Sequence, residues 1–470
     1  MRRLLAGIVA IGVLAGCGAP SVPPVPPTPV VPDPGLPQRL VEAVRGEGAV
    51  RHLEELQRIA DTHAGNRALG TPGYDASVEY AARVLREAGY TVETPQFTVR
   101  RFVPGDTRLV VGGRAVAVEL LAYSPAGEVR GPLAVIAQDE TSGCEAADYA
   151  GVATGSVVLV RRGACPFAQK SITAAAAGMA AVIVANDADG PLTGATLGEE
   201  ADGALPTVGV TRADADALLA GAAAELTVQA GVEETTSRNV VAQTTTGDPG
   251  EVVMAGAHLD SVPAGPGIND NGSGVALLLE TAVRLGGAPA VANAVRFGFW
   301  GAEEVGLVGS TRYVEGLTDA ERARVAAYLN VDMAASPNAG YLVYDGDDSD
   351  QVGEGAGPPG SAAIEKLLVD GLSAAGVAAD GADFTGRSDY GPFIERGIPS
   401  GGVFTGAERE KTPAQAQKWG GTAGEAYDGC YHQACDTLVG VDRVALDRNA
   451  DAVAFALATL ALSTEVLGRP

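Results

Sequence analysis

Basic residues, cysteine, histidine and aromatic residues are all scarce in this sequence, and each shortage narrows the range of functions. The 470 residues contain 33 Lys and Arg against 58 Asp and Glu, so the formal charge is −25 and the surface repels nucleic acid and anionic lipid. The five cysteines show no CxxC or Cys/His finger spacing, which argues against a cysteine-rich zinc site. Aromatic residues make up only 5%, but 46% of positions are hydrophobic, which is enough for globular cores. The length predicts two folded domains with tails.

Long apolar runs are also lacking, and the one near the N-terminus is too short for a transmembrane span. Arg2 and Arg3 precede this run at residues 4–14, and small residues follow it, as in a secretory signal. The string L-A-G-C that ends at Cys17 resembles a bacterial lipobox, in which the cysteine is lipidated and becomes the mature N-terminus. An ordinary cleaved signal with an incidental Cys17 is the alternative. We therefore expect a lipoprotein signal peptide at residues 1–17 and an exported protein, which is tethered to the bacterial membrane by a lipid anchor only or secreted.

The other four cysteines form two pairs along the chain, namely Cys144 and Cys165, and Cys430 and Cys435. An even number of cysteines in an exported chain indicates disulfides. The simplest pairing is Cys144 with Cys165 and Cys430 with Cys435.

The residue pattern changes several times along the chain. Residues 18–37 are rich in proline, which predicts an extended spacer. Helical spacing of apolar residues predicts helices at 51–60 and 74–88, and a strand at 91–99 follows. Residues 105–232 then show short strands between Gly/Asp turns, which indicates an insertion with its own small core. Those strands are expected at residues 133–137, 157–160, 181–184 and 207–210.

After residue 237 the pattern becomes a repetition of strand, loop and helix, which indicates a mostly parallel sheet covered by helices. Continuous apolar runs predict buried strands at 252–257, 294–300 and 328–331. We expect helices at 271–285 and 446–467, and a capping box formed by Thr318 and Glu321. The acidic, glycine-rich residues 345–357 are expected to form a solvated loop.

Polar residues follow each of these three strands. They are His258 and Asp260, then Asn269 to Gly274, then Glu303 and Glu304, and finally Asp332. Ligand sites in open parallel sheets form outside the carboxyl ends of the strands. Imidazole and carboxylate groups are the usual ligands of catalytic zinc, and a carboxylate can bind two ions at once. Another of the four histidines, His432, also lies in a polar, turn-rich segment.

Six strings in this part of the chain resemble the motifs of the secreted dinuclear-zinc aminopeptidases of the Streptomyces/Aeromonas type. They are A-G-A-H-L-D-S, G-I-N-D-N-G-S-G, W-G-A-E-E, Y-L-N-V-D-M, G-R-S-D-Y-G-P-F and C-Y-H-Q-A-C-D-T. The similarity covers roughly residues 50–97 and 237–465. It implies an α/β zinc-exopeptidase fold, with a mixed, mostly parallel sheet sandwiched by helices.

Carried over residue by residue, the resemblance implies a site for two zinc ions. Asp270 would bridge the two ions. His258 and Asp332 would complete one site, and Glu304 and His432 would complete the other.

The resemblance also implies roles around the metals. Glu303 would be the general base, and Asp260 would orient a ligand. Tyr431 would hydrogen-bond the developing oxyanion, on a loop that a Cys430–Cys435 disulfide would stiffen. Arg387 and Phe404 match positions that contact substrate, and Arg387 would favour a free carboxylate on short peptides. In the alternative interpretation Tyr431 and Phe404 are ordinary packing residues and Asp332 is a helix N-cap.

Two further resemblances are weaker. Asp447 and Asp451 match a pair that binds calcium in some relatives, but Ala43 and Val44 stand where the other ligands would be, so we expect solvated acids there rather than Ca²⁺. Residues 158–170, V-L-V-R-R-G-A-C-P-F-A-Q-K, resemble a protease-associated (PA) domain, in which Cys144 and Cys165 are placed as for its disulfide. Such an insert is expected to cover the mouth of the active site or to select substrates.

These resemblances predict a first peptidase segment at residues 38–104, a PA domain at 105–232 and a second peptidase segment at 233–470. The expected activity is removal of N-terminal residues, with large apolar residues preferred, from peptides with a free N-terminus, by a protein that we expect to be a monomer. A carboxypeptidase or dipeptidase of the same fold is the nearest alternative, and a glutaminyl cyclase would use one zinc. A non-catalytic, receptor-like peptide-binding protein would be expected to lack some ligands, and a purely structural lipoprotein would leave the six motifs unexplained.

Overall fold

The computed structural model describes residues 31–199, 201–351, 353 and 355–468. The predicted signal peptide at 1–17, the lipidation site Cys17 and most of the spacer at 18–37 lie outside the described residues. No described helix is both long enough and apolar enough to cross a membrane.

The first of two eight-stranded sheets holds the strands that were expected to carry the site. Its four central strands are parallel, with antiparallel pairing at β1/β10, β10/β12 and β14/β16. The expected mixed, mostly parallel sheet is thus confirmed. In spatial order the strands are β1 (Thr91–Glu93), β10 (Val240–Gln243), β12 (Asn293–Trp300), β11 (Asp248–His258), β13 (Val325–Val331), β16 (Ser400–Phe404), β14 (Leu342–Tyr344) and β15 (Asp380–Ala382).

Helices cover both faces of this sheet because alternate residues of its central strands are apolar on both sides. In β11, Val253, Ala255 and Ala257 join one buried cluster, while Val252 and Met254 join the cluster on the opposite face. The first face packs against α1 (Leu36–Ala43), α2 (Gly46–Thr62), α3 (Pro72–Glu87), α6 (Gly274–Leu285), α9 (Ser361–Ala374) and α12 (Arg443–Leu462). The second packs against α7 (Val308–Gly316) and α10 (Gly391–Glu395), with α8 (Asp319–Arg324) after α7 and α11 (Pro413–Trp419) further along the chain.

Several predicted elements differ from the observed ones at their ends. The strand expected at 91–99 is broken at Pro95, where the chain passes from β1 into β2 (Gln96–Val111) of the second sheet. The helix expected at 271–285 begins only at Gly274, because the backbone of Asp270 and Asn271 is not helical. The last helix runs from Arg443 to Leu462 instead of 446–467, and a short 3₁₀ turn, Glu465–Leu467, follows it. The Thr318/Glu321 capping box is confirmed.

The second sheet forms a separate module with a buried cluster on each of its faces. Its helices are α4 (Phe167–Ala176) and α5 (Arg212–Asp216), and the Cys144–Cys165 disulfide, with an S–S distance of 2.01 Å, lies in this module. In spatial order its strands are β3 (Arg114–Val116), β2, β9 (Ala223–Arg238), β5 (Gly127–Val135), β6 (Val157–Arg161), β7 (Ala181–Ala185), β8 (Thr207–Val210) and β4 (Glu119–Leu120).

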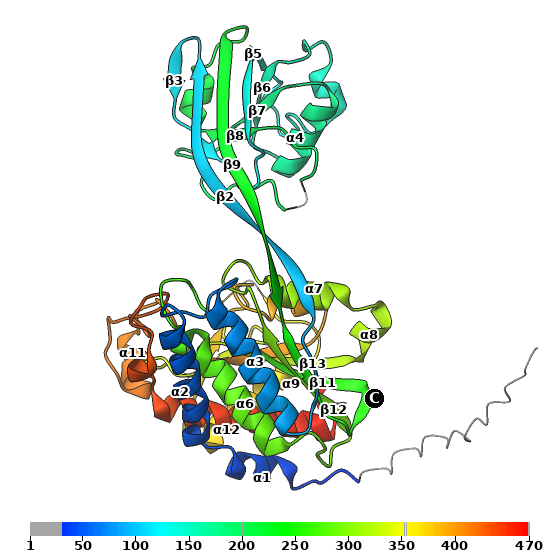
Figure 1. Cartoon of the computed structure of the whole chain (residues 1–470), viewed down its shortest axis with the longest axis vertical. Helices are drawn as coiled ribbons and strands as arrows, with labels where there is room; N and C mark the ends of the chain where they lie inside the picture. The colour runs from blue at the N-terminus through cyan, green and yellow to red at the C-terminus, as the bar shows by residue number, and fades with distance from the viewer. Residues whose placement is uncertain (1–30, 200, 352, 354, 469–470) are drawn as a thin grey trace, which may run out of the picture.

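A twisted ribbon of the long strands β2 and β9 joins the module to the rest of the chain (Figure 1). The boundaries expected at residues 105 and 232 fall inside these paired strands, next to an irregularity between Pro104 and Thr107. An ion pair of 3.6 Å between Glu199 and Arg312 of α7 is a second connection. Because α7 follows the carboxyl end of β12, the module stands over the edge of the first sheet where the predicted site lies (Figure 1).

Gly274 allows α6 to start in contact with the end of β13. A Cβ atom at this position would lie 2.3 Å from the carbonyl oxygen of Val331 and 2.4 Å from Oδ1 of Asn271. Gly274→Ala should therefore lower the free energy of unfolding by about 1–3 kcal/mol, as overpacking does. Gly316→Ala, in open space at the end of α7, is the matched control and should change it by less than about 0.5 kcal/mol. Urea unfolding of the two variants tests this, and equal stabilities would contradict it.

Candidate metal centre

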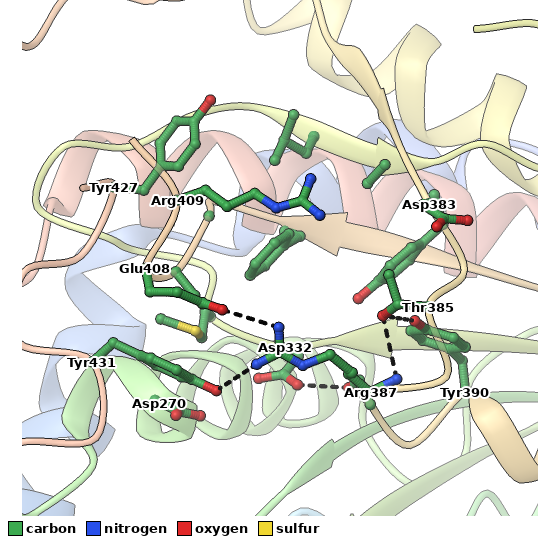
Figure 2. Close-up of a pocket in the computed structure, with 18 of the residues that line it drawn as sticks. Asp270, Asp332, Asp383, Thr385, Arg387, Tyr390, Glu408, Arg409, Tyr427 and Tyr431 are labelled. Atoms are coloured by element: carbon green, nitrogen blue, oxygen red, sulfur yellow. Dashed lines mark hydrogen bonds and ion pairs between the residues drawn. The ribbon is translucent and has the colours of Figure 1, made fainter. Parts of the chain in front are cut away.

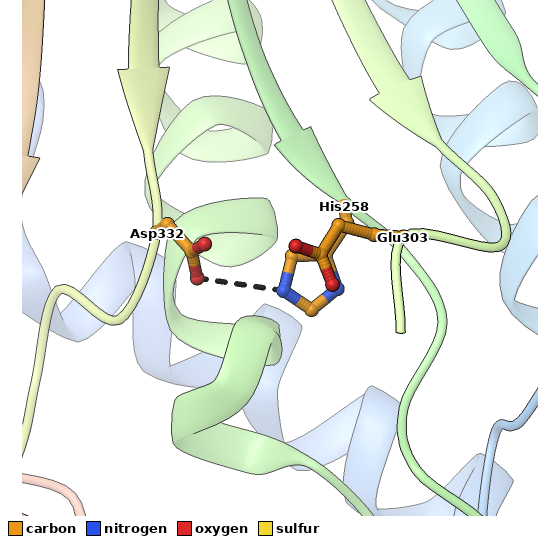
Figure 3. A group of neighbouring side chains, drawn as sticks. All are labelled: His258, Glu303 and Asp332. Carbon is orange, nitrogen blue, oxygen red and sulfur yellow. Dashed lines mark ion pairs between the residues drawn. The ribbon is translucent and has the colours of Figure 1, made fainter. Parts of the chain in front are cut away.

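The carboxyl ends of three parallel strands bring the predicted ligands together. His258 is the last residue of β11, Glu303 and Glu304 come soon after β12, and Asp332 directly follows β13. In Figure 3 the side chains of His258, Glu303 and Asp332 converge from these three strand ends. The polar residues that follow the three strands in the sequence thus lie close together in the folded chain.

Asp270 lies between two groups of side chains. Its Oδ1 is 3.1 Å from Nε2 of His258, which is also 3.4 Å from Oδ1 of Asp332. Its Oδ2 is 3.1 Å from Nε2 of His432, which is also 3.0 Å from Oε2 of Glu304. Each group offers one imidazole, one carboxylate of its own and one oxygen of Asp270.

The donor atoms fit a metal ion better than they fit a network of hydrogen bonds. Oε1 of Glu304 is buried and lacks a hydrogen-bond partner among the described residues, and so does Oδ1 of Asp332 apart from its ion-pair contact of 3.4 Å with His258. An unpartnered buried oxygen is costly, and a cation would satisfy it. Imidazole nitrogens with carboxylate oxygens are the donors that zinc takes in catalytic sites.

Asp260 contacts both His258 and the backbone of the segment that carries Glu303 and Glu304. Its carboxylate is fully buried and accepts the backbone N–H groups of Glu303 at 3.2 Å and Glu304 at 3.4 Å. Its carbonyl oxygen lies 3.2 Å from Nδ1 of His258, which leaves Nε2 to face Asp270. These contacts hold the backbone of Glu303 and Glu304 and the ring of His258 in place.

A chain of hydrogen bonds runs from the sheet to Asp332. Nε1 of Trp300 donates to the hydroxyl of Tyr328, which donates to Oδ1 of Asn330. Nδ2 of Asn330 donates to Oγ of Ser388, and that hydroxyl donates to Oδ2 of Asp332 at 2.6 Å. One oxygen of Asp332 is thereby held, and the other faces His258.

The loop that carries Asp270 is fixed by residues to which the sequence had assigned no role. Asp436 accepts the backbone N–H groups of Asn269 at 2.7 Å and of Asp270 at 3.0 Å, and Asp428 accepts Nδ2 of Asn269 at 2.7 Å. The peptide bond between Asp270 and Asn271 is cis. Asp436 lies in the string C-Y-H-Q-A-C-D-T, so the sequence showed the residue but not that it accepts hydrogen bonds from the backbone of Asp270.

Arg67 is another residue whose role the sequence did not reveal. Its guanidinium is completely buried and donates to the carbonyl oxygens of Leu259, Pro266 at 2.9 Å and Gly267 at 2.7 Å. Burial lowers the pKa of Arg67 to about 10, although the nearby carboxylates, with that of Asp260 first, oppose this. Arg67 therefore places a positive charge behind the site and fixes the segment between His258 and Asp270.

Three non-glycine residues beside the site adopt left-handed backbone angles. They are Ala302 with φ 60°, Met333 with φ 55° and His432 with φ 58°. Such angles cost of order 1 kcal/mol or more each and cluster at functional sites, where the surrounding structure imposes them. Each of them turns the chain at or next to a predicted ligand or base.

The accumulated negative charge shifts the titration of several groups. Hydrogen bonds with Asp270 and Glu304 raise the pKa of His432 to about 10. The pKa of His258 is also raised well above its ordinary value, because surrounding carboxylates outweigh the opposing effect of burial. Burial raises the pKa of Glu304 to about 7 and that of Glu303 well above its usual range, and neighbouring carboxylates add to both shifts.

Asp389, in the string G-R-S-D-Y-G-P-F but without an expected role, is buried near Glu303, and burial raises its pKa to about 7.

A cavity of about 350 Å³ opens beside the metal-ligand candidates. Tyr431, Arg387 and Phe404 all line it, as the family resemblance predicted for residues near a substrate, and Figure 2 shows Tyr431 and Arg387. Tyr431 also stacks on His432, with ring centroids 3.8 Å apart. The Cys430–Cys435 disulfide, with an S–S distance of 2.08 Å, closes the loop that carries both rings. Both expected disulfides are thus confirmed.

Asp447 and Asp451 differ from the expected solvated acids. Oδ1 of Asp447 accepts the backbone N–H of Gly46 at 2.6 Å, at the start of α2. Asp451 is partly buried, and this burial, with the charge of Asp447, raises its pKa to about 6. Asp447 therefore joins α12 to α2.

Zinc should displace protons when it binds to this site. Because the pKa values of His258 and His432 are raised, both imidazoles are protonated at about pH 7 in the absence of a cation, whereas zinc requires them deprotonated. At about pH 7, titration of the metal-free protein with zinc should release about two protons per chain from the imidazoles and about half of one more from Glu304, whose pKa is about 7, and affinity should rise with pH. Calorimetry in buffers of different ionisation enthalpy measures this. His432→Ala should release about one proton fewer, and heats that do not depend on the buffer would contradict the assignment.

Comparisons with known proteins agree with the geometry. The model for peptidase family M28 matches residues 239–457, and the model for the PA domain matches residues 129–218. A probable lipoprotein aminopeptidase, LpqL, of Mycobacterium tuberculosis is 49% identical over 436 residues, which are 91% of this chain and 86% of that protein. An aminopeptidase of Pseudomonas aeruginosa is 44% identical over 92% of this chain and 84% of its own length. Among solved structures, an aminopeptidase from Aneurinibacillus sp. strain AM-1 has a TM-score of 0.63 at 27% identity and covers 91% of this chain and 96% of its own.

Proposed function

The chain belongs to peptidase family M28 and carries a PA domain, and we propose that it is a zinc-dependent aminopeptidase that removes N-terminal residues, large apolar ones by preference, from peptides. The observation that carries this proposal is the position of Asp270, whose two carboxylate oxygens each lie 3.1 Å from a different histidine. That arrangement suits two ions that share one carboxylate. The relatives named as aminopeptidases support the choice of reaction.

The residues present would hold two zinc ions. His258 and Asp332 would hold one, Glu304 and His432 the other, and Asp270 both. Zinc in such a site supplies a Lewis acid that lowers the pKa of water and polarises the scissile carbonyl group.

Glu303 is the group that we assign to proton transfer. It lies at the same strand ends but belongs to neither pair of ligands around Asp270, and burial raises the pKa of its carboxyl group well above the usual range. A carboxylate with a raised pKa takes a proton from the attacking water more readily and then passes it to the leaving amine. Asp260 would keep Glu303 in place through the backbone N–H that it accepts.

Tyr431 would stabilise the developing negative charge on the substrate. Its hydroxyl faces the cavity beside Asp270, and the disulfide holds its loop. A donor that is already positioned when the charge develops stabilises the transition state without reorganisation.

The walls of the cavity support the expected preference for large apolar residues. Met333, Leu342, Tyr344 and Phe404 line it together with the charged groups at its mouth. Several relatives carry the name leucine aminopeptidase, including one of Aspergillus fumigatus at 43% identity. An apolar wall of this kind favours a large side chain through the surface that it removes from water.

We also propose that the protein is exported and held at the membrane through Cys17, since the mycobacterial relative is named a lipoprotein. The PA domain would then restrict access to the site, because its module stands over the edge of the sheet where the ligands converge (Figure 1).

Glu303→Ala should separate catalysis from metal binding. We expect kcat for leucine p-nitroanilide to fall by about 10²- to 10⁴-fold, because the proton acceptor is lost, while the zinc content stays that of the wild type. The matched change Glu304→Ala, one residue along, should lower the zinc content as well. Steady-state kinetics and elemental analysis of both variants measure the difference.

Two results would count against the proposal. Loss of zinc in Glu303→Ala would mean that Glu303 is a ligand and not the base. Hydrolysis of the N-acetylated substrate by the wild type at an undiminished rate would exclude an aminopeptidase, since that enzyme needs a free amine.

A further inference from the structure

Arg387 lies at the mouth of the cavity with part of its hydrogen-bonding capacity already used. Its Nη1 donates to Oε1 of Glu408 at 3.0 Å, and its Nη2 lies 3.5 Å from the hydroxyl of Tyr431 (Figure 2). Its backbone N–H donates to Oγ1 of Thr385 at 3.3 Å. The guanidinium is thus held between two loops, one after β16 and one closed by the Cys430–Cys435 disulfide.

Glu408 competes with any approaching substrate carboxylate for the hydrogen bonds of Arg387. A guanidinium binds a carboxylate best through two parallel N–H donors, and Glu408 occupies Nη1, which is part of that fork. A substrate whose carboxylate reaches this point must displace Glu408 or accept a poorer contact beside a second negative charge. A substrate with an amide or a continuing chain at the same point need not displace Glu408 and brings no second negative charge next to it.

We propose that Glu408 is a specificity-determining residue, which occupies Arg387 in the free enzyme and so reduces the advantage of short peptides that end in a free carboxylate. The inference rests on the proposed aminopeptidase function. It deepens it by naming longer peptides and peptide amides as substrates that the enzyme accepts beside dipeptides.

The solvent exposure of Arg387 and Glu408 limits the size of the expected substrate preference. The side chains of Arg387 and Glu408 are 64% and 51% exposed, so water and salt screen their attraction. The interaction strength of exposed ion pairs corresponds to a preference of about fivefold at most. The effect should also shrink at high ionic strength.

The test compares leucylglycine with its C-terminal amide, which differ only in the charge at the end. The measured quantity is the ratio of kcat/KM for the acid to kcat/KM for the amide. In Glu408→Gln this ratio should rise about three- to fivefold over the wild type, because the competing charge is gone while the shape of the side chain is kept. In Arg387→Ala the ratio should fall, because no cation remains to bind the substrate carboxylate.

Glu410→Gln is the matched control. Glu410 lines the same cavity two residues along the loop, and in the described part of the chain it forms no ion pair with Arg387. It loses the same unit of charge, so an equal rise of the ratio in both variants would show a general effect of charge and overturn the proposal. An unchanged ratio in Glu408→Gln would overturn it as well.

A double variant locates the effect on Arg387. When Arg387→Ala is present, adding Glu408→Gln should leave the ratio the same, and a further three- to fivefold rise would contradict a role through Arg387. Failure of the proposed function looks different, because a wild-type protein that hydrolyses neither leucylglycine, its amide nor leucine p-nitroanilide is no aminopeptidase at all.

Discussion

The concentration of negative charge around Asp270 is the constraint on which the rest of this structure depends. The carboxylates of Asp260, Asp270, Glu303, Glu304 and Asp332 meet at one edge of a sheet with only two imidazoles among them. Attraction to these carboxylates raises the pKa values of both histidines, while burial and repulsion between the carboxylates raise those of Glu303 and Glu304. On the proposed function, two zinc ions would supply further positive charge that offsets this repulsion.

The fold provides the rigidity that such a site needs. Four parallel strands fix the starting points of the ligand loops, and buried groups behind them fix the loops themselves. Arg67 holds the segment between His258 and Asp270, Asp436 holds the backbone of Asp270, and a hydrogen-bonded chain ending at Ser388 holds Asp332. The outer face of the site is built differently, from exposed loops that carry Arg387, Glu408 and the stacked rings of Tyr431 and His432. Three of the five proposed ligands thus stand at strand ends, whereas His432 shares its loop with Tyr431 beside the cavity.

Much of this could be predicted from the sequence because apolar runs and the residues that end them are local features. The strands around His258, Glu303 and Asp332, the Thr318/Glu321 capping box and both disulfides follow from spacing and composition. The supporting partners could not be predicted in the same way. Arg67 reaches Gly267 across 200 positions, and Asp436 reaches Asp270 across 166, so only the folded chain shows those contacts. The late start of α6 was missed for a related reason, since the helical pattern of apolar residues does not record the non-helical turn that presents Asp270.

Metal content gives the most direct test of the shared carboxylate. Elemental analysis after dialysis should find two zinc ions per chain in the wild type and at most one in Asp270→Asn, which keeps the shape of the side chain but loses its charge. Asp347→Asn, in a separate acidic group with Asp345 and Glu365, should keep both ions. Two zinc ions in Asp270→Asn, or a loss of zinc in Asp347→Asn, would contradict a centre in which Asp270 joins the two metals.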